Sequence, residues 1–417
     1  MRIARVAISL FLLFAVHASA QTFEQLTFIR LTDAPMSARS QALGSTTDPS
    51  ATDLALVATN PAALASLQKR LLSIGVAQTS YDTIAMRFSD NFVSSFRDEA
   101  TAAGIAHAAI AMPLGDFVIA GYYANEPRLR GNGPLTTAVP FRTYEPVLCD
   151  GGACPTFILS AGQPFERRDT RYGLTASWQR GAIAVGAGAE RRALDEQAEV
   201  LRSVIGPVPM PGPTNERAFR RTSGSDVVLN AGIVWTVTPR VKLSSSYRGG
   251  GEVSRTTSVC GIEQINSLFC ATNEAQLAKS TQKLPDTLRA GVSIRATDRL
   301  LLAAEAVRRG YGDLAHDDYT VFGLAADYPY RDVTELHAGA EYRVPTRVLI
   351  ALRAGWWRDP ARWSESSVFL RGPLNDPVEH LTFGLGLDFG PAQLDVAVDN
   401  ADQGGMRRAS IALTHAF

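Results

Sequence analysis

Side chains alternate between apolar and small or polar along many ten-residue stretches, and this period of two constrains the fold more than any other feature. In residues 287–296, Leu, Ala, Val, Ile and Ala alternate with Thr, Arg, Gly, Ser and Arg. Residues 335–344 and 380–389 repeat the pattern. Alternation of this kind predicts extended strands with one face suited to hydrocarbon and the other to water.

The connections between these stretches separate a membrane barrel from a soluble sandwich, whose strands also alternate. Outer-membrane barrels join their strands by short turns on one side and longer loops on the other. Short turns are predicted near residues 113–116, 179–181, 238–239, 297–298, 345–346 and 390–391. Longer polar loops are predicted near residues 126–169, 193–224, 251–283, 311–332 and 359–379, with a short one at 401–406.

Counting a first strand at 71–79, six hairpins and a last strand at 407–417 predicts about fourteen strands. The number is even, and both ends fall on the short-turn side, as in single-chain bacterial barrels. No stretch after the N-terminus has about eighteen consecutive apolar residues, so helices cannot span the bilayer and the sheet must close on itself. The strands that flank 113–116 alternate poorly, and the sequence leaves their facing open.

The N-terminus predicts export. Arg2 and Arg5 precede an apolar run at 6–16, and Ala18-Ser19-Ala20 provides a small-residue cleavage site, the arrangement of a secretory signal. We expect a signal peptide at 1–20, an N-terminal plug (hatch) at 21–68 and an all-β transmembrane barrel at 69–417. The expected location is the outer membrane of a Gram-negative bacterium, with outer-membrane lipid as a partner.

Charge, cysteine and histidine patterns narrow the function. Lys plus Arg equals Asp plus Glu at 41 each, which argues against a nucleic-acid partner. No hydrolase elbow, paired histidine ligands or Ser, His and acid spacing is present, so we expect no enzyme, metal or cofactor; a lipase or protease barrel is the alternative. Four cysteines can form two local disulfides in an oxidising compartment, or remain as free thiols: Cys149, Cys154, Cys260 and Cys270.

Several segments resemble the long-chain fatty acid transporter (FadL) family. The stretch at 38–44, then Ser50-Ala51-Thr52-Asp53, then Asn60-Pro61-Ala62-Ala63-Leu64, is similar to the hatch of that family, and 284–291 resembles its recurrent strand start. Residues 241–248 and 339–343 resemble its strand ends. The resemblance implies passive transport of hydrophobic small molecules such as long-chain fatty acids, with plug residues Arg39, Gly44, Asn60, Pro61 and Ala62. It also implies that Asn60 bonds the plug backbone to the barrel wall.

Two further resemblances concern the ends of the chain. The opening at 28–31 with 37–39 and 42–44 is also similar to the PorV and PorQ proteins, which implies a secretion-accessory or structural barrel as the alternative function. The last strand, which ends at Phe417, resembles the C-terminal signal that the barrel-assembly machinery recognises during biogenesis. Ser45-Thr46-Thr47 departs from both groups, which continue there with small residues and glycine.

The alternation places many charges on the inner face, and these are the candidates to line the lumen. They could hold a ligand carboxylate or pair with one another and with the plug; the main candidates are Arg289, Arg295, Glu341, Arg343 and Arg353. Mid-strand glycines on that face could admit the plug or relieve curvature: Gly291, Gly339, Gly355, Gly384 and Gly386.

Aromatic residues near strand ends predict interfacial girdles: Tyr247, Tyr342, Trp356, Trp357 and Trp363. A different element, Asn125-Glu126-Pro127, follows the third predicted strand. By resemblance to the family it could mark an inward kink that opens the wall sideways. The alternative is that the loop simply begins there.

Overall fold

The computed structural model describes residues 37–48, 53–81, 85–89, 92–95, 100–132, 139–140, 156–158, 164–204, 215–262, 276–312, 319–321, 324–326, 331–361, 377–402 and 406–417. The helices are short: α3 (Ala38–Ala42), η2 (Leu54–Ala58) and η3 (Pro61–Ser66). The strands are β1 (Leu71–Tyr81), β2 (Ala85–Ser89), β3 (Phe92–Ser95), β4 (Ala100–Leu114), β5 (Phe117–Asn132), β6 (Val139–Pro140), β7 (Thr156–Ile158), β8 (Pro164–Arg180), β9 (Ile183–Val204), β10 (Asn215–Thr238), β11 (Val241–Arg248), β12 (Glu252–Ile262), β13 (Gln276–Lys283), β14 (Thr287–Arg295), β15 (Leu300–Arg309), β16 (Tyr319–Val321), β17 (Leu324–Ala326), β18 (Val333–Val344), β19 (Leu349–Asp359), β20 (Val378–Asp388), β21 (Ala392–Ala401) and β22 (Met406–Ala416).

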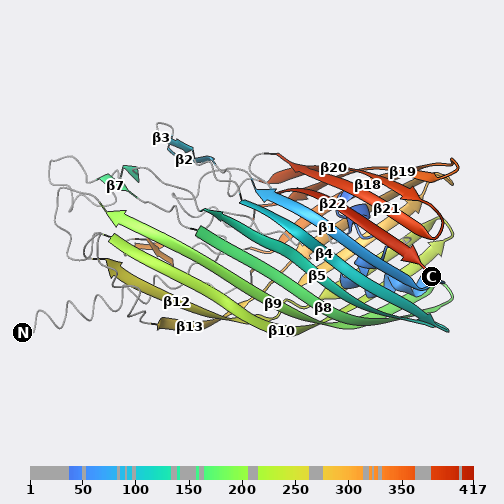
Figure 1. Ribbon diagram of the computed structural model, residues 1–417, viewed down its shortest axis with the longest axis horizontal. Helices are drawn as coiled ribbons and strands as arrows, with labels where there is room; N and C mark the ends of the chain where they lie inside the picture. The colour runs from blue at the N-terminus through green and yellow to red at the C-terminus, as the bar shows by residue number, and fades with distance from the viewer. Residues whose placement is uncertain are drawn as a thin grey trace, which may run out of the picture.

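The strands form a closed antiparallel barrel that the chain crosses fourteen times, as the alternation and the turn spacing predict (Figure 1). Two of the fourteen barrel strands are divided into two labelled segments each: β11 continues as β12, and β13 continues as β14. The barrel closes where β22 pairs with β1, Leu71 lying opposite Ala416. The six short turns lie where the sequence predicts them, at the end of the barrel that carries the C-terminus.

The outer face is apolar and the inner face is small or polar. In β22, Ile411 and Leu413 are 48% and 46% exposed, whereas Ala412 between them is 6% exposed. The other barrel strands repeat this contrast, with exposed Leu, Ile, Val and Phe side chains around the circumference. A soluble protein rarely exposes so much contiguous apolar surface, whereas a membrane barrel turns it toward the acyl chains. No helix among the described residues has the length and hydropathy of a membrane span.

Strands β4 and β5, whose facing the sequence left open, turn an apolar surface to both sides. Ile110, Met112 and Phe117 are at least 40% exposed on the outside. The inner residues of the two strands are buried together with apolar residues of η2 and η3, forming one cluster that includes Leu54, Val57, Leu64, Ala109, Ala111, Val118 and Ala120. The alternation is weak here because the inner wall meets the N-terminal helices rather than a polar lumen.

The girdle prediction is wrong for one tryptophan. Tyr247 and Tyr342 are 48% and 45% exposed on the outside, as a girdle requires. Trp357, in contrast, is 3% exposed on the inner face of β19, because its position in the alternation points inward while that of Trp356 points outward. Trp363 lies outside the described residues.

Candidate functional site

The N-terminal segment, residues 37–48 and 53–67, is made of three short helices, each begun by a polar cap. The side chains of Ser37, Asp53 and Asn60 accept hydrogen bonds from the backbone N–H groups at the start of α3, η2 and η3. Short polar residues are favoured at such positions because they satisfy N–H groups that the helix leaves unpaired. The helices are rich in alanine and leucine, and nearly all of their residues are buried. In Figure 1 this blue segment lies among the strands toward the end that carries the C-terminus.

Glycines on the inner wall let the backbone of this segment approach closely. A Cβ atom on Gly339 would lie 2.4 Å from the carbonyl oxygen of Leu43, and one on Gly355 would lie 2.1 Å from the amide nitrogen of Gly44. A Cβ on Gly384 would lie 2.4 Å from Ala42. The expectation that mid-strand glycines admit the N-terminal segment is therefore confirmed for these three positions.

The other two inner-face glycines have different neighbours. A Cβ on Gly291 would meet Ser244 and Ala304, and one on Gly386 would meet the side chains of Arg353 and Asp395. Of the five predicted glycines, only those on β18, β19 and β20 thus contact the N-terminal segment.

Arg39 ties α3 to the wall through buried ion pairs. Its guanidinium lies 2.9 Å from Asp48 within the segment and 2.9 Å from Glu341 on β18. Arg353 on β19 joins Glu341, at 2.7 Å, to Asp395 on β21, at 2.6 Å. Burial alone would lower the pKa of Arg39, but the charges of Glu341 and Asp48 raise it above its ordinary value, so Arg39 remains a cation.

The surface of the inner wall that contacts residues 39–44 is here called the seat. Neutral hydrogen bonds also contribute to it. The hydroxyl of Thr382 accepts from the N–H of Gly44 at 3.0 Å and donates to the carbonyl of Ala42 at 3.1 Å. His337 Nδ1 lies 2.7 Å from the carbonyl oxygen of Gly44. Gln41 donates to the carbonyl of Arg408 at 2.7 Å. Gly44 has φ +67°, a backbone conformation that favours glycine.

The η3 helix contacts the inner wall on the opposite side of the barrel, at β9 and β10. A Cβ on Gly186 of β9 would lie 2.6 Å from the backbone of Pro61 and Ala62, and one on Gly232 of β10 would lie 2.1 Å from Asn60 Oδ1. The hydrogen bond of Asn60 Oδ1 is local, from the N–H of Ala62 at 3.1 Å. The expectation that Asn60 bonds the segment to the wall is therefore replaced by a cap on η3 that touches the wall at a glycine.

Three stacked rings lie beside the seat of α3. Trp357 lies between His337 and His380, with ring centroids 5.5 Å and 3.6 Å away and nearly parallel planes. Asp399 accepts from the Trp357 indole at 3.1 Å and lies 2.8 Å from His380 Nδ1. Sequence reasoning missed this group because its members come from separate strands. The inward position of Trp357 in the alternation was the one available signal.

A second buried cluster lines β5, β8 and β9. The hydroxyl of Tyr122 donates to Glu190 at 2.7 Å. Arg192 lies 2.6 Å from Asp169, and Arg167 pairs with Glu196. Acidic partners thus accompany Arg192 and Arg167 on this wall.

The wall is irregular where Asn125-Glu126-Pro127 was expected to mark a kink. The ladder between β4 and β5 pairs His107 with Ala124 and resumes in the same register at Thr101 and Arg130. Within the interruption, the Asn125 amide donates to the carbonyl of Ile105 at 3.3 Å. The ladder with β8 changes register at the same point. Pro127 has no N–H to offer a neighbouring strand, which accounts for a break at this place.

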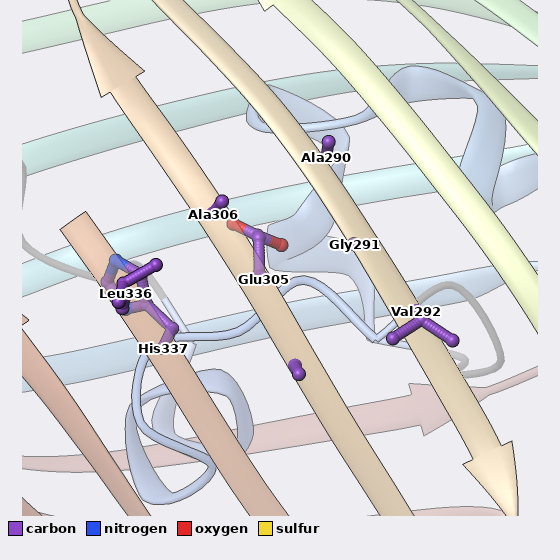
Figure 2. A pocket seen from close by; sticks show the side chains of 8 residues that line it. Ala290, Gly291, Val292, Glu305, Ala306, Leu336 and His337 are labelled. Carbon is purple, nitrogen blue, oxygen red and sulfur yellow. The ribbon is translucent and has the colours of Figure 1, made fainter. Parts of the chain in front are cut away.

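A shallow hollow of about 430 Å³ lies on the outer face across β14, β15 and β18 (Figure 2). Ala290, Ala304 and Ala306 replace the larger side chains found elsewhere on this face, and Gly291 is among the lining residues. The blue N-terminal segment crosses on the inner side of the same strands, where the N–H of Thr47 donates to Glu305 at 2.8 Å. The hollow therefore faces the acyl chains rather than the lumen.

The remaining candidate residues are dispersed. Arg289 lies 2.5 Å from Glu305, and Arg343 lies 2.8 Å from Glu341 with a half-exposed side chain. Arg295 is exposed at the short-turn end of β14. Among the described residues, no His, Cys, Asp and Glu side chains form a group that could hold a metal ion. Cys149, Cys154 and Cys270 lie outside the described residues, as does the side chain of Cys260, and the expected signal peptide at 1–20 lies outside them too.

Comparison with known proteins identifies the fold. No family model and no curated sequence matches the chain. Among solved structures, a Pseudomonas aeruginosa FadL homologue is 15% identical with a TM-score of 0.64, over 93% of this chain and 99% of that one. The Ralstonia pickettii toluene transporter TbuX is 16% identical with a TM-score of 0.59, over 92% and 98%. The P. putida toluene transporter TodX is 15% identical with a TM-score of 0.59, over 91% and 97%. The fold implied by the sequence resemblance, a FadL-type barrel, is confirmed.

Proposed function

We propose that this chain is an outer-membrane channel for the passive entry of hydrophobic small molecules, and that its N-terminal segment acts as a plug. The observation that carries the proposal is the seat of that segment: a backbone buried against three glycines of the inner wall and held by the Arg39 ion pairs. An open porin does not need a surface that binds an N-terminal segment inside its lumen. The structural neighbours include proteins described as toluene transporters and a FadL homologue.

The compounds carried would be long-chain fatty acids or small aromatic hydrocarbons. Entry by diffusion needs no energy source, and apolar molecules cross the polar surface of the outer membrane slowly unless a protein shields them. The plug would hold a captured molecule in the lumen and stop the leakage of water-soluble solutes. The signal peptide expected at 1–20 would direct the chain to the outer membrane.

The interrupted ladder at 125–129 offers a route out of the barrel. A molecule leaving sideways through the wall would enter the lipid without crossing the plug. In this proposal Pro127 keeps the wall open, because it cannot donate to the ladder.

Uptake measurements test the proposal. Cells that express the chain are expected to take up labelled oleate or toluene faster than cells that lack it, and liposomes containing the purified protein should not swell in small sugars. Pro127→Ala is expected to slow uptake, whereas Pro113→Ala, a matched change in β4, should not. Unchanged uptake of both compounds would remove the proposal. Stable co-purification with exported proteins would instead favour a secretion-accessory barrel.

A further inference from the structure

The inner wall next to η3 carries polar side chains in a defined order. Gly186 of β9 and Gly232 of β10 are covered by Pro61 and Asn60. Two residues further along the same strands, on the same face, lie Gly188 and Asn230, which pair directly. Because side chains on one face repeat every second residue, this position is the first on the wall beyond the footprint of η3.

Two side chains lean over Gly188 from either side. Thr175 on β8 and Asn230 on β10 both pair with Gly188 across the sheet. A Cβ on Gly188 would lie 2.3 Å from the methyl group of Thr175 and 2.5 Å from Asn230 Oδ1. The missing side chain thus leaves room above Gly188 for the Thr175 methyl group and the Asn230 amide, which places both polar residues at one point of the wall.

Glu190, the next inner-face residue of β9, adds a carboxylate. It is fully buried, and one oxygen accepts from Tyr122 at 2.7 Å. The Tyr122 ring lies over Gly173, where a Cβ would come within 2.1 Å of it. The glycine allows the phenol to reach across to Glu190.

These groups keep unused hydrogen-bonding capacity in a buried place. Asn230 is 2% exposed and Thr175 is 4% exposed. Within the part of the chain that the structure describes, both amide atoms of Asn230, the hydroxyl of Thr175 and Glu190 Oε1 have no hydrogen-bond partner. A buried polar group without a partner is costly, and a ligand that enters the lumen could supply the missing partner.

The cluster offers both hydrogen-bond donors and acceptors, and this determines which functional groups of a ligand it can bind. A hydroxyl group can donate to Glu190 Oε1 and accept from the Asn230 amide. A carboxylate cannot donate, and it would be repelled by the charge of Glu190. The charges of Arg171 and Arg248 also reach Tyr122, and Arg248 lies opposite Asn230 across the sheet. Neither arginine is free, and Arg192 and Arg167 are engaged by Asp169 and Glu196.

Apolar surface adjoins the cluster and could take the rest of such a molecule. Tyr122 belongs to the buried apolar cluster that includes Leu54 and Val57. Val228, opposite Glu190 on β10, is 5% exposed. Further along β9, Leu194 packs with apolar residues of the β11–β12 and β13–β14 barrel strands.

We propose that Asn230, Thr175 and Glu190 form a binding site in the lumen for the hydroxyl group of an uncharged hydrophobic compound, an alcohol or a phenol. The inference rests on the proposed function and narrows its substrate class. The site would slow a hydroxylated molecule beside the plug, while a plain hydrocarbon would pass with only apolar contacts.

Binding of three matched compounds to the purified full chain in detergent tests this site. p-Cresol, toluene and p-toluate differ only in carrying a hydroxyl, nothing or a carboxylate on the same ring. A hydrogen bond to a charged group predicts that p-cresol binds roughly tenfold more tightly than toluene, and that p-toluate binds weakest. Asn230→Leu and Thr175→Val should each lower p-cresol affinity toward that of toluene and leave toluene unchanged.

Thr287→Val is the matched control, since Thr287 is also a buried inner-face threonine whose hydroxyl has no partner among the described residues. It should leave the p-cresol preference intact. Equal affinity for p-cresol and toluene, or a preference that survives in both site variants, overturns the hydroxyl site while the channel stands. Failure of the unaltered protein to bind any of the three also overturns the hydroxyl site, whereas the proposed function falls only if uptake of oleate and of toluene is unchanged as well. Thr175→Val, which keeps the side-chain shape, guards against misfolding of the Asn230 variant.

Discussion

Replacing Gly339 by alanine should unseat the N-terminal segment. The new Cβ would lie 2.4 Å from the carbonyl oxygen of Leu43 and 2.8 Å from two further backbone atoms. Ordinary contact requires about 3.5 Å, so the segment or the strand must move by about 1 Å. Backbone atoms cannot rotate away as the end of a side chain can.

The cost follows from what the shift breaks. Overpacking of this kind costs about 1–3 kcal/mol. The same movement strains the hydrogen bonds of Gly44 with Thr382 and His337, each worth about 1 kcal/mol. A total of about 3–5 kcal/mol would reduce the ratio of seated to unseated segment by roughly 150-fold to several thousand-fold.

Gly291→Ala provides the control, because it makes the same change on the same face of a nearby strand. There the new Cβ would be 3.2 Å from a serine hydroxyl and 3.3 Å from a carbonyl of the wall, away from the N-terminal segment. Liposome swelling in arabinose and protease cleavage within 37–67 measure the seating. Both should rise in Gly339→Ala and stay near the unaltered level in Gly291→Ala. Equal behaviour of the two variants would refute the argument that glycines form the seat.

Three further predictions concern other contacts. Arg39→Met leaves buried carboxylates on both sides of the lost cation, so the free energy that holds the segment should fall by about 3–5 kcal/mol, seen as a lower urea midpoint for protease protection of the segment. Asp332 accepts from the N–H of Gly312 and from Arg308, and these bonds lower its pKa below the ordinary 3.8. A lowered carboxyl pKa gives stability that is present above the ordinary value and lost as pH falls through the lowered one. The protection of the Gly312 amide against hydrogen exchange, relative to its intrinsic rate at each pH, should therefore be present at pH 5 and fall only below about pH 3.8; Asp332→Ala should remove it at both. The cysteines are expected to form local disulfides, Cys149 with Cys154 and Cys260 with Cys270. Peptide mass spectrometry without reductant checks this, and four alkylated thiols would contradict it.

The alternation of side chains, together with the pattern of short turns and long loops, was enough to predict the barrel itself. The period of two and the six short turns are local features, and the strand count follows from them. The residues of each strand by themselves indicate which of its faces is apolar. The segment at 38–44 and the Asn60-Pro61-Ala62 element were also visible as a unit apart from the strands. Their resemblance to the hatch of the FadL family indicated this, whereas the caps formed by Ser37, Asp53 and Asn60 were found only in the structure.

Only the tertiary structure decided what each inner side chain meets. Arg39 and Glu341 are 302 residues apart, and no sequence feature near either residue indicates that the two form an ion pair. Trp357 lies inside between two histidines because strand register aligns three strands. The inner face of β4 and β5 is apolar because the N-terminal helices cover it. The period of the sequence indicates on which face of the sheet a side chain lies. The residue that this side chain contacts across the lumen depends on strand register, strand tilt and barrel closure, which are properties of the whole barrel.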